Sequence, residues 1–233
     1  MENKAVIGIL GGMGPAATSE LFQRIIENTK ANSDQDHVSA IIVNDTQIPD
    51  RTEYILGRGK NPVPLLRNNL SKLKHAGADV ALIPCMTAHT FIKSLNVNTP
   101  IKIINAIEIV EDYINDFYPE VKNVGLLATT GSIQSKVFEE YLTKKIHTPN
   151  SWQQRQLMEA IYGPEGIKAG NVNSKQVLNI FKIIDDMYQR GIELLIAGCT
   201  ELSLVIDEKS LDVPLIDPIT LLAKHAVKLG SSK

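Results

Sequence analysis

The stretch HAGADVALIPCMTAHT, residues 75–90, holds a glycine, an apolar run and then a cysteine. QRGIELLIAGCTELSL, residues 189–204, has the same arrangement. The third residue of both stretches is glycine, and the two cysteines of the chain, Cys85 and Cys199, align with each other. Each cysteine therefore follows a strand-like run at the same point of a repeated pattern, which indicates an internal repeat.

A second pair of segments extends this repeat. VIGILGGMGPAATSELFQRII, residues 6–26, aligns with VGLLATTGSIQSKVFEEYL, residues 124–142, so that Gly8 matches Gly125. Each half then runs in one order: strand, glycine-containing turn, helix, and later a strand that ends in cysteine. Chance similarity between common α/β segments is the alternative. Two blocks in the same order and at nearly equal spacing favour a duplication.

Short β-branched runs alternate with helical patterns, which predicts parallel α/β sheets. Strands are expected at residues 5–10, 39–44, 80–84, 101–104, 123–128, 194–197 and 215–217. Helices are expected at residues 17–30, 62–76, 87–95, 106–117, 133–142, 174–190 and 218–229. The expected fold is two similar, doubly wound parallel-sheet domains related by a pseudo-two-fold axis, with the active site in the cleft between them. One lobe comprises residues 1–105 and about 215–233, and the other comprises residues 106–214.

The composition is that of a globular protein, with 43% hydrophobic and 21% charged residues. A net charge of −2 gives no electrostatic basis for binding nucleic acid or an anionic membrane. The apolar run at residues 5–10 is too short for a secretory signal, and no run approaches the ~20 residues of a membrane span. We therefore expect a cytoplasmic protein, in which thiols stay reduced. Two cysteines supply neither a disulfide scaffold nor a four-ligand zinc site.

The two thiols could perform acid/base chemistry. Ligands of open α/β sheets bind at the carboxyl ends of the strands, where both cysteines lie. Thr87 and Thr200 follow the cysteines as expected helix N-caps, and the positive helix end would lower each thiol pKa. Two opposed acid/base groups suit inversion at a carbon stereocentre: one thiolate removes a proton, and the opposing thiol supplies one to the other face. Inert core cysteines are the alternative, which their matching repeat positions disfavour.

Other candidate groups have structural alternatives of equal standing. Arg51, expected in a loop, presents a fork suited to a carboxylate, or it forms a surface pair with Asp50. Lys168, between glycines, could reach a second carboxylate or be an ordinary surface lysine. His89 lies one helical turn after Cys85 and either orients the thiol or is a satisfied core histidine.

Two further site types are disfavoured. The glycines at residues 8–14 match the dinucleotide fingerprint poorly, so we interpret them as a tight turn that brings backbone amides near an anion. A metal site built from Cys85, His89 and Cys199 lacks further ligands at suitable spacing. We therefore predict no metal.

Six segments together resemble one known family. They are GGMGPAAT (11–18), IPDRT (48–52), PCMTAH (84–89), LLATTGSIQSKVFEEYL (126–142), EGIKAG (165–170) and AGCTEL (197–202). In this combination and order the chain resembles the aspartate/glutamate racemases that work without pyridoxal phosphate, and within them the aspartate racemase branch. The resemblance implies a two-domain pseudo-symmetric enzyme without a cofactor, acting on a small amino acid and commonly dimeric.

Residue roles follow from the resemblance by position. It implies that Cys85 and Cys199 are the catalytic acid/base pair, and that Arg51 and Lys168 contact the side-chain carboxylate. The remaining substrate-binding residues that it implies are Met13, Met86, Thr87, Thr130 and Thr200, with supporting roles for Asn44, His89 and Glu201. Glu201 fits the aspartate racemase pattern, since glutamate racemases typically have histidine there.

Met86 is a departure from that pattern, because the family usually has asparagine directly after the first cysteine. A thioether is a poor substitute for an amide that bonds a carboxylate or ammonium group. We predict two-base racemisation of an acidic amino acid, with aspartate first and glutamate next. The alternatives are a related hydantoin racemase or maleate isomerase, or a carboxylate-binding protein that has lost catalysis.

Overall fold

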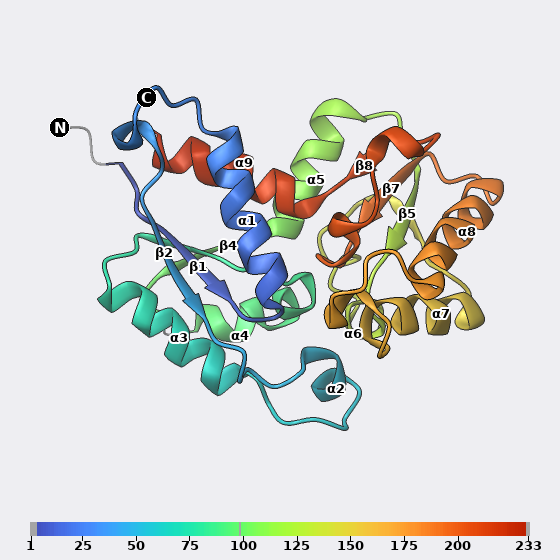
Figure 1. The fold of residues 1–233 in the computed structure, drawn as a ribbon, viewed down its shortest axis with the longest axis horizontal. Helices are drawn as coiled ribbons and strands as arrows, with labels where there is room; N and C mark the ends of the chain where they lie inside the picture. The colour runs from blue at the N-terminus through green and yellow to red at the C-terminus, as the bar shows by residue number, and fades with distance from the viewer. Residues whose placement is uncertain (1–3, 98, 232–233) are drawn as a thin grey trace.

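The protein contains two parallel four-stranded sheets (Figure 1). The computed structural model describes residues 4–97 and 99–231. The first sheet, in the order β2-β1-β3-β4, consists of β1 (Ile7–Gly11), β2 (Ala40–Asn44), β3 (Val80–Leu82) and β4 (Lys102–Ile104). The second, in the order β6-β5-β7-β8, consists of β5 (Asn123–Leu127), β6 (Lys145–His147), β7 (Leu194–Ala197) and β8 (Leu215–Ile216). The same order occurs twice, which confirms the predicted fold class.

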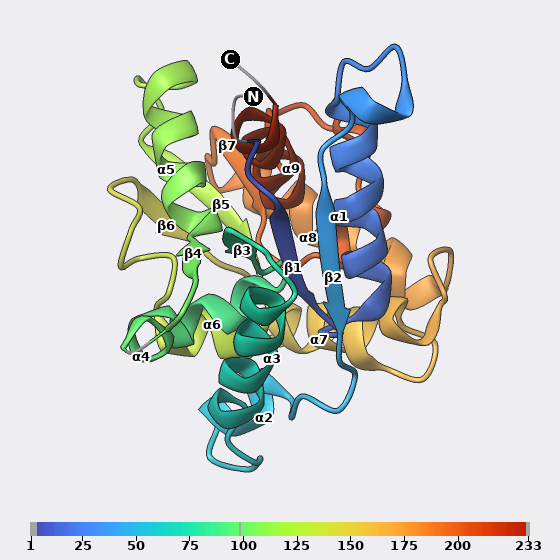
Figure 2. The same ribbon diagram turned by 90° about the vertical axis from the view of Figure 1, so that its left-hand side faces the viewer.

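Helices cover both faces of the sheets. They are α1 (Pro15–Asn28), α2 (Arg51–Ile55), α3 (Val63–His75), α4 (Ile92–Asn96), α5 (Ala106–Phe117), α6 (Thr130–Ser135), α7 (Ser151–Tyr162), α8 (Lys175–Gln189) and α9 (Pro218–Gly230). Figure 2 looks onto the first lobe, where α1 and α3 both pack on β1. Within the described ranges, 4–97 and 99–231, no helix combines the length and the apolar character that crossing a membrane requires.

Alternate residues of β1 explain this double cover, because successive side chains of a strand point to opposite faces. Ile7 and Ile9 pack into a central core with α1, α5 and α9, and that core also holds Leu126 of β5 and Ile196 of β7. Leu10 instead packs with α3 in an outer core. The second lobe has its own outer core between its sheet and helices α7 and α8. The central core thus joins the two lobes.

The last strand and helix link the lobes. β8 pairs with β7 in the second sheet, while α9 packs against α1 and α5. Asp217 lies between β8 and α9 and caps α9, because its side chain accepts a hydrogen bond from the amide of Ile219. The exact boundaries of the two lobes stay a prediction.

The glycines that end α3 and α8 confirm the predicted helix ends. Gly77 has a φ of 100° and Gly191 a φ of 84°. Both are left-handed conformations that favour glycine, and both directly follow a helix C-cap. The repeat is therefore visible in the backbone as well as in the sequence.

Two predicted helices are wrong in part. The helix expected at residues 133–142 is replaced by α6, which ends at Ser135 and is followed by Lys136, a C-cap residue with a left-handed φ of 56°. The helix expected at residues 87–95 is a 3₁₀ turn, Met86–Phe91, followed by α4. In both segments hydroxyl side chains bond across the lobes, Thr90 to Ser135 at 2.9 Å. Ser135 Oγ also bonds locally to the carbonyl of Ser132 at 3.0 Å, and local bonds of this kind compete with a continuous helix.

Three elements were not predicted. α2 occupies a segment that was expected to be a loop. β6 is a short strand at the edge of the second sheet that pairs with β5, and it contains the charged Lys145. α7 begins with mostly polar residues, which give a weak helical pattern. Asn150 and Gln153 nevertheless form a capping box at its start, and that signal is visible in the sequence.

Candidate active site

Cys85 and Cys199 line a single cavity. Cys85 follows β3 and Cys199 follows β7, the equivalent strands of the two sheets. Both thiols are free and buried, with exposed fractions of 6% and 5%. The other residues around this cavity are Met13, Arg51, Met86, Thr87, Thr129, Tyr162, Lys168, Thr200 and Glu201. The fold thus brings the predicted thiol pair together.

The cavity is narrow. Its volume is about 10 Å³, which accommodates about one water molecule. An amino acid is several times larger, so the lobes or a lining side chain must move before a substrate can enter.

The Cys199 thiol faces a carboxylate. Its Sγ atom donates to Glu201 Oε2 at 3.0 Å. Burial raises the pKa of Cys199 well above its usual range, and the negative charge of Glu201 raises it further. The expectation that a helix N-terminus lowers this pKa is wrong, because only a three-residue 3₁₀ turn, Leu202–Leu204, follows.

Glu201 also holds Lys168 in an ion pair, through its other carboxylate oxygen. Burial disfavours the charged form of each partner, but their mutual attraction outweighs it. The pKa of Lys168 is therefore raised and that of Glu201 lowered. The Lys168 side chain is 22% exposed and that of Glu201 6%. The pair is charged at neutral pH, and the cation of Lys168 is already compensated.

Arg51 lies beside Cys85 in the cavity. It begins α2, whose N-cap is Asp50, so the predicted loop position is wrong. Its Nη1 atom donates to the carbonyl of Pro49 at 3.1 Å, and its Nη2 atom to that of Met13 at 3.2 Å. Burial disfavours its charge, but the neighbouring Cys85 and Asp50 raise the pKa of Arg51. Its Nε atom is buried without a hydrogen-bond partner among the described residues.

Three hydroxyl groups join the lobes beside Cys85. Thr87 Oγ1 lies 2.9 Å from Thr129 Oγ1, and Ser132 Oγ donates to Thr87 Oγ1 at 3.0 Å. Thr129 and Ser132 are themselves 3.1 Å apart through their hydroxyl oxygens. Thr87 is therefore not a helix N-cap. Thr200 is not one either, since its hydroxyl donates to Glu201 at 3.1 Å.

His89 positions the turn that carries Cys85. Its Nε2 atom accepts the amide proton of Ala106 at 3.1 Å, which leaves Nδ1 to donate to the Cys85 carbonyl at 3.0 Å. Burial lowers the pKa of His89 to about 4. Of the two roles left open by the sequence, the structure favours a neutral core histidine that holds the backbone of Cys85.

Two predicted site residues lie outside the cavity. Asn44 is exposed at the end of β2. Thr130 faces α7, where its hydroxyl accepts from Gln154 at 3.2 Å, and Thr129 lines the cavity in its place. Thr130 begins α6, and its side chain points toward the neighbouring α7.

Tyr162 was not predicted to line the site. It is the last residue of α7, and its side chain lines the cavity although it is far from both cysteines in the sequence. No motif in the sequence marks it.

The glycine-rich turn does not offer a free amide at Gly12, because that N–H donates to Thr18 Oγ1 at 3.0 Å. Gly12 has a φ of +94°, and a Cβ atom there would lie 2.2 Å from the Asp45 carbonyl oxygen, so only glycine fits. Residues 4–97 and 99–231 hold no group of three or more His, Cys, Asp or Glu side chains suited to a metal ion.

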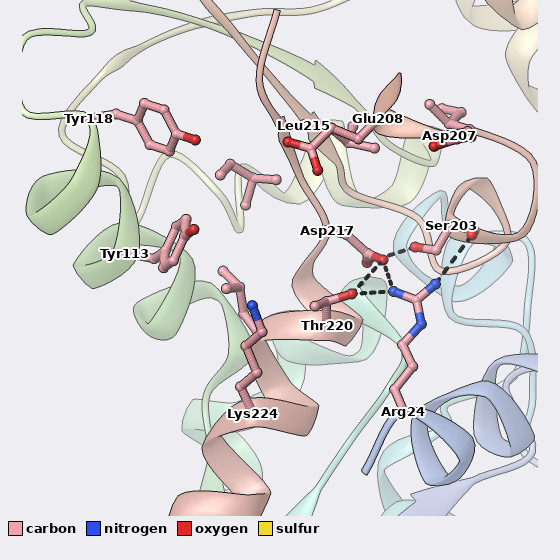
Figure 3. Close-up of a pocket in the computed structure, with 13 residues that line it drawn as sticks. Arg24, Tyr113, Tyr118, Ser203, Asp207, Glu208, Leu215, Asp217, Thr220 and Lys224 are labelled. Atoms are coloured by element: carbon pink, nitrogen blue, oxygen red, sulfur yellow. Dashed lines mark hydrogen bonds and ion pairs between the residues drawn. The ribbon is translucent and has the colours of Figure 1, made fainter. Parts of the chain in front are cut away.

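A second cavity, of about 260 Å³, lies beside the loop that follows Glu201 (Figure 3). On one side of it Arg24 of α1 forms an ion pair with Asp217 and a hydrogen bond with Thr220. The Arg24 guanidinium also donates to the carbonyl of Ser203 at 3.4 Å. One side chain of the first lobe thus holds the start of α9 and the loop beyond the second cysteine.

Comparison with known proteins places these features in a family. A family model described as Asp/Glu/hydantoin racemase matches residues 10–226. The broad-specificity amino-acid racemase of Bacillus subtilis is 25% identical over 95% of this chain and 96% of its own length.

Solved structures agree with this placement. The aspartate racemase of Picrophilus torridus is 27% identical, with a TM-score of 0.81 over 98% of this chain and 95% of that one. The glutamate racemase of Francisella tularensis, solved with D-glutamate, is 17% identical, with a TM-score of 0.70 over 98% of this chain and 81% of that one. The second likeness concerns the fold alone.

Proposed function

The chain belongs to the Asp/Glu/hydantoin racemase family, and on that premise we propose that it racemises an acidic amino acid, aspartate first and glutamate next. The observation that carries the proposal is the convergence of Cys85 and Cys199 on one cavity from equivalent strands of the two lobes. The aspartate racemase of Picrophilus torridus supports the choice of substrate.

The mechanism uses the two cysteines as opposed acid and base. One thiolate removes the α-proton from one face of the substrate, and the other thiol delivers a proton to the opposite face. The reverse direction exchanges the two roles. Glu201 accepts a hydrogen bond from the Cys199 thiol, and both side chains line the cavity. His89 fixes the backbone of Cys85.

The cations of the site would hold the substrate carboxylates. The Nε atom of Arg51, buried without a partner among the described residues, supplies a free donor. Lys168 contributes only if the substrate competes with Glu201 for its ammonium group. The hydroxyl groups of Thr87 and Thr129, bonded to each other in the narrow cavity, could reorient toward the α-carboxylate.

A broader substrate range is a second candidate. The ion pair of Lys168 with Glu201 leaves Arg51 as the less compensated cation, whereas a dicarboxylate is best served by two. Met86 also lies in the cavity as a side chain with no strong hydrogen-bonding group. The broad-specificity racemase of Bacillus subtilis supports this reading.

One experiment tests both candidates. The enzyme is incubated in D₂O with each of a panel of acidic, amidated and neutral amino acids, and deuterium at Cα and the two enantiomers are measured. We expect cofactor-free exchange and inversion with aspartate. Inversion of neutral amino acids at comparable rates would support the second candidate, and no exchange with any of them would indicate a binding protein.

The two-base mechanism has its own test in Cys85→Ser and Cys199→Ser. Each substitution should abolish racemisation, because a serine hydroxyl is far too weak an acid at neutral pH. Each variant can still exchange the α-proton of one enantiomer through the remaining thiol. Near-normal racemisation in either variant would refute the mechanism.

A further inference from the structure

Tyr162 bridges the two lobes at the edge of the cysteine cavity. It ends α7 in the second lobe, and its hydroxyl donates to Asp50 Oδ2 at 3.2 Å. Asp50 caps α2 in the first lobe. The Tyr162 ring lies over the Lys168 ammonium, with the Nζ atom 5.2 Å from the ring centroid, a distance at which a cation–π attraction operates. One side chain therefore spans the lobes and covers a cation of the site.

Tyr162 also separates two spaces. It lines the cysteine cavity of about 10 Å³ and a hollow of about 850 Å³ on the second lobe, and among the described residues it is the one that lines both. The hollow is walled in part by Ile133, Pro149, Met158 and Pro164, with Arg155 and Glu159 as charged groups. Tyr162 is itself 37% exposed, as suits a side chain at the mouth of a site.

We propose that Tyr162 closes the active site and limits the length of the amino-acid side chain that the enzyme accepts. This proposal rests on the proposed racemase function. When the lobes open but the ring stays across the mouth, the site admits only a short side chain such as that of aspartate. With the ring removed or displaced, a longer side chain can extend past Lys168 into the hollow, where apolar walls and two charged groups could receive it.

The chemistry of the hydroxyl fits a closing contact that can open. Burial raises the pKa of Tyr162, and the charge of Asp50 raises it further. The hydroxyl therefore stays protonated and acts as a donor near neutral pH. A single bond at a partly exposed mouth is readily exchanged for water. Substrate entry then requires breaking the hydrogen bond between Tyr162 and Asp50, and the central core can stay packed.

The test compares Tyr162→Ala and Tyr162→Phe by kcat/KM for aspartate and for longer amino acids such as glutamine, methionine and lysine. Tyr162→Ala should raise the ratio of longer substrates to aspartate by on the order of 10-fold or more, since a pocket discriminates by about that factor for each methylene. Tyr162→Phe keeps the ring and should keep the ratio, with kcat/KM lowered several-fold by loss of the bond to Asp50.

Trp152→Ala is the matched control. Trp152 is an aromatic residue of the same helix, 60% exposed and outside both spaces, and its loss should not change the ratio. An unchanged ratio in Tyr162→Ala, with an active wild type, overturns the proposal while leaving the racemase function standing.

A second readout does not depend on racemisation. The cysteines are labelled with iodoacetamide, a small reagent, and with N-phenylmaleimide, a bulky one. Tyr162→Ala should speed labelling by the bulky reagent by on the order of 10-fold more than labelling by the small one, relative to Trp152→Ala. Equal acceleration of both reagents, or none, would overturn the role of Tyr162 even if the wild type turned over no amino acid.

Discussion

Cys199 Sγ and Glu201 Oε2 are 3.0 Å apart, so the second thiol of the site is bonded to an anion. Cys85 has a cation, Arg51, on its side instead. The two thiols occupy equivalent positions of a duplicated fold but different electrostatic surroundings. A symmetric backbone thus carries an asymmetric acid/base pair.

Glu201→Gln tests this asymmetry. Burial and then Glu201 raise the pKa of Cys199, while Lys168 lowers it. Removing the carboxylate charge and freeing Lys168 both favour the thiolate, so the pKa of Cys199 should fall. The limb of the pH–rate profile that reports Cys199 should therefore move to lower pH, and kcat should fall several-fold, because a thiolate of lower pKa is a weaker base for the α-proton.

Glu165→Gln is the control for that experiment, since Glu165 is exposed and lies near Lys168 in the chain without lining the cavity. It should leave both limbs in place. If both limbs of the Glu201→Gln profile also stay unmoved, Glu201 does not govern the Cys199 thiol.

The fold and the thiol pair were predictable from the sequence because each depends on local patterns. The strand-like runs, the turn glycines such as Gly77 and the repeated cysteines are all signals carried by a few adjacent residues. The strand β5 and the helix α5 were found close to their observed bounds.

The contacts between the lobes could not be predicted in the same way. Thr87 looks like a helix cap in sequence, but its hydroxyl bonds to Thr129 and Ser132 of the other lobe. Tyr162 reaches the site because α7 ends opposite α2, which no local pattern specifies. The pKa of Cys199 depends on burial and on Glu201, so its rise could not be inferred from the strand end alone.

Thr87→Val tests how strongly the hydroxyl groups hold the lobes together. The substitution keeps the shape of the side chain but removes its bonds to Thr129 and Ser132, which remain bonded to each other. The free energy of unfolding in urea should fall by about 1 kcal/mol. Thr90→Val, at a less buried pair, should cost less. An equal or smaller loss for Thr87→Val would show that the buried hydroxyl group stabilises the fold no more than the less buried one.

Arg24→Met tests the ion pair between α1 and Asp217. The side chains are 17% and 14% exposed, so solvent screens them only in part, and the substitution should lower the free energy of unfolding by about 1–2 kcal/mol. Because Arg24 also donates to the Ser203 carbonyl, racemase kcat should fall as well. Arg58→Met is the matched control: its pair with Glu53 is exposed, at 63% and 46%, and should change neither quantity measurably.

His89 should make stability depend on pH. Its folded pKa is about 4, below the usual 6.5, so between these values the unfolded chain binds a proton that the folded protein does not. Stability from this group is complete above about pH 6.5 and is lost as the pH falls to about 4, a total of about 3 kcal/mol. Urea unfolding from pH 7 to pH 4.5 measures it. His89→Gln should flatten this slope relative to the exposed His75→Gln, and parallel slopes would argue against it.

The thiols should respond to ligand together, because Cys85 and Cys199 line one narrow cavity. Both thiols are buried, so both should be labelled slowly. Labelling requires the thiolate, so the raised pKa of Cys199 should slow its labelling further. Aspartate bound between the thiols should slow the labelling of both. The labelling rate should fall in proportion to the fraction of enzyme without ligand, as mass action requires. Mild oxidation should inactivate the enzyme slowly, and reductant should reverse it. Because a disulfide needs Cα atoms within roughly 7 Å, the cross-link can form only when the site is empty, so aspartate should slow it. Peptide mapping of labelled and oxidised enzyme, with and without aspartate, distinguishes the two cysteines. Protection of one thiol alone would show that the substrate does not lie between them, and the two-base assignment would then fail.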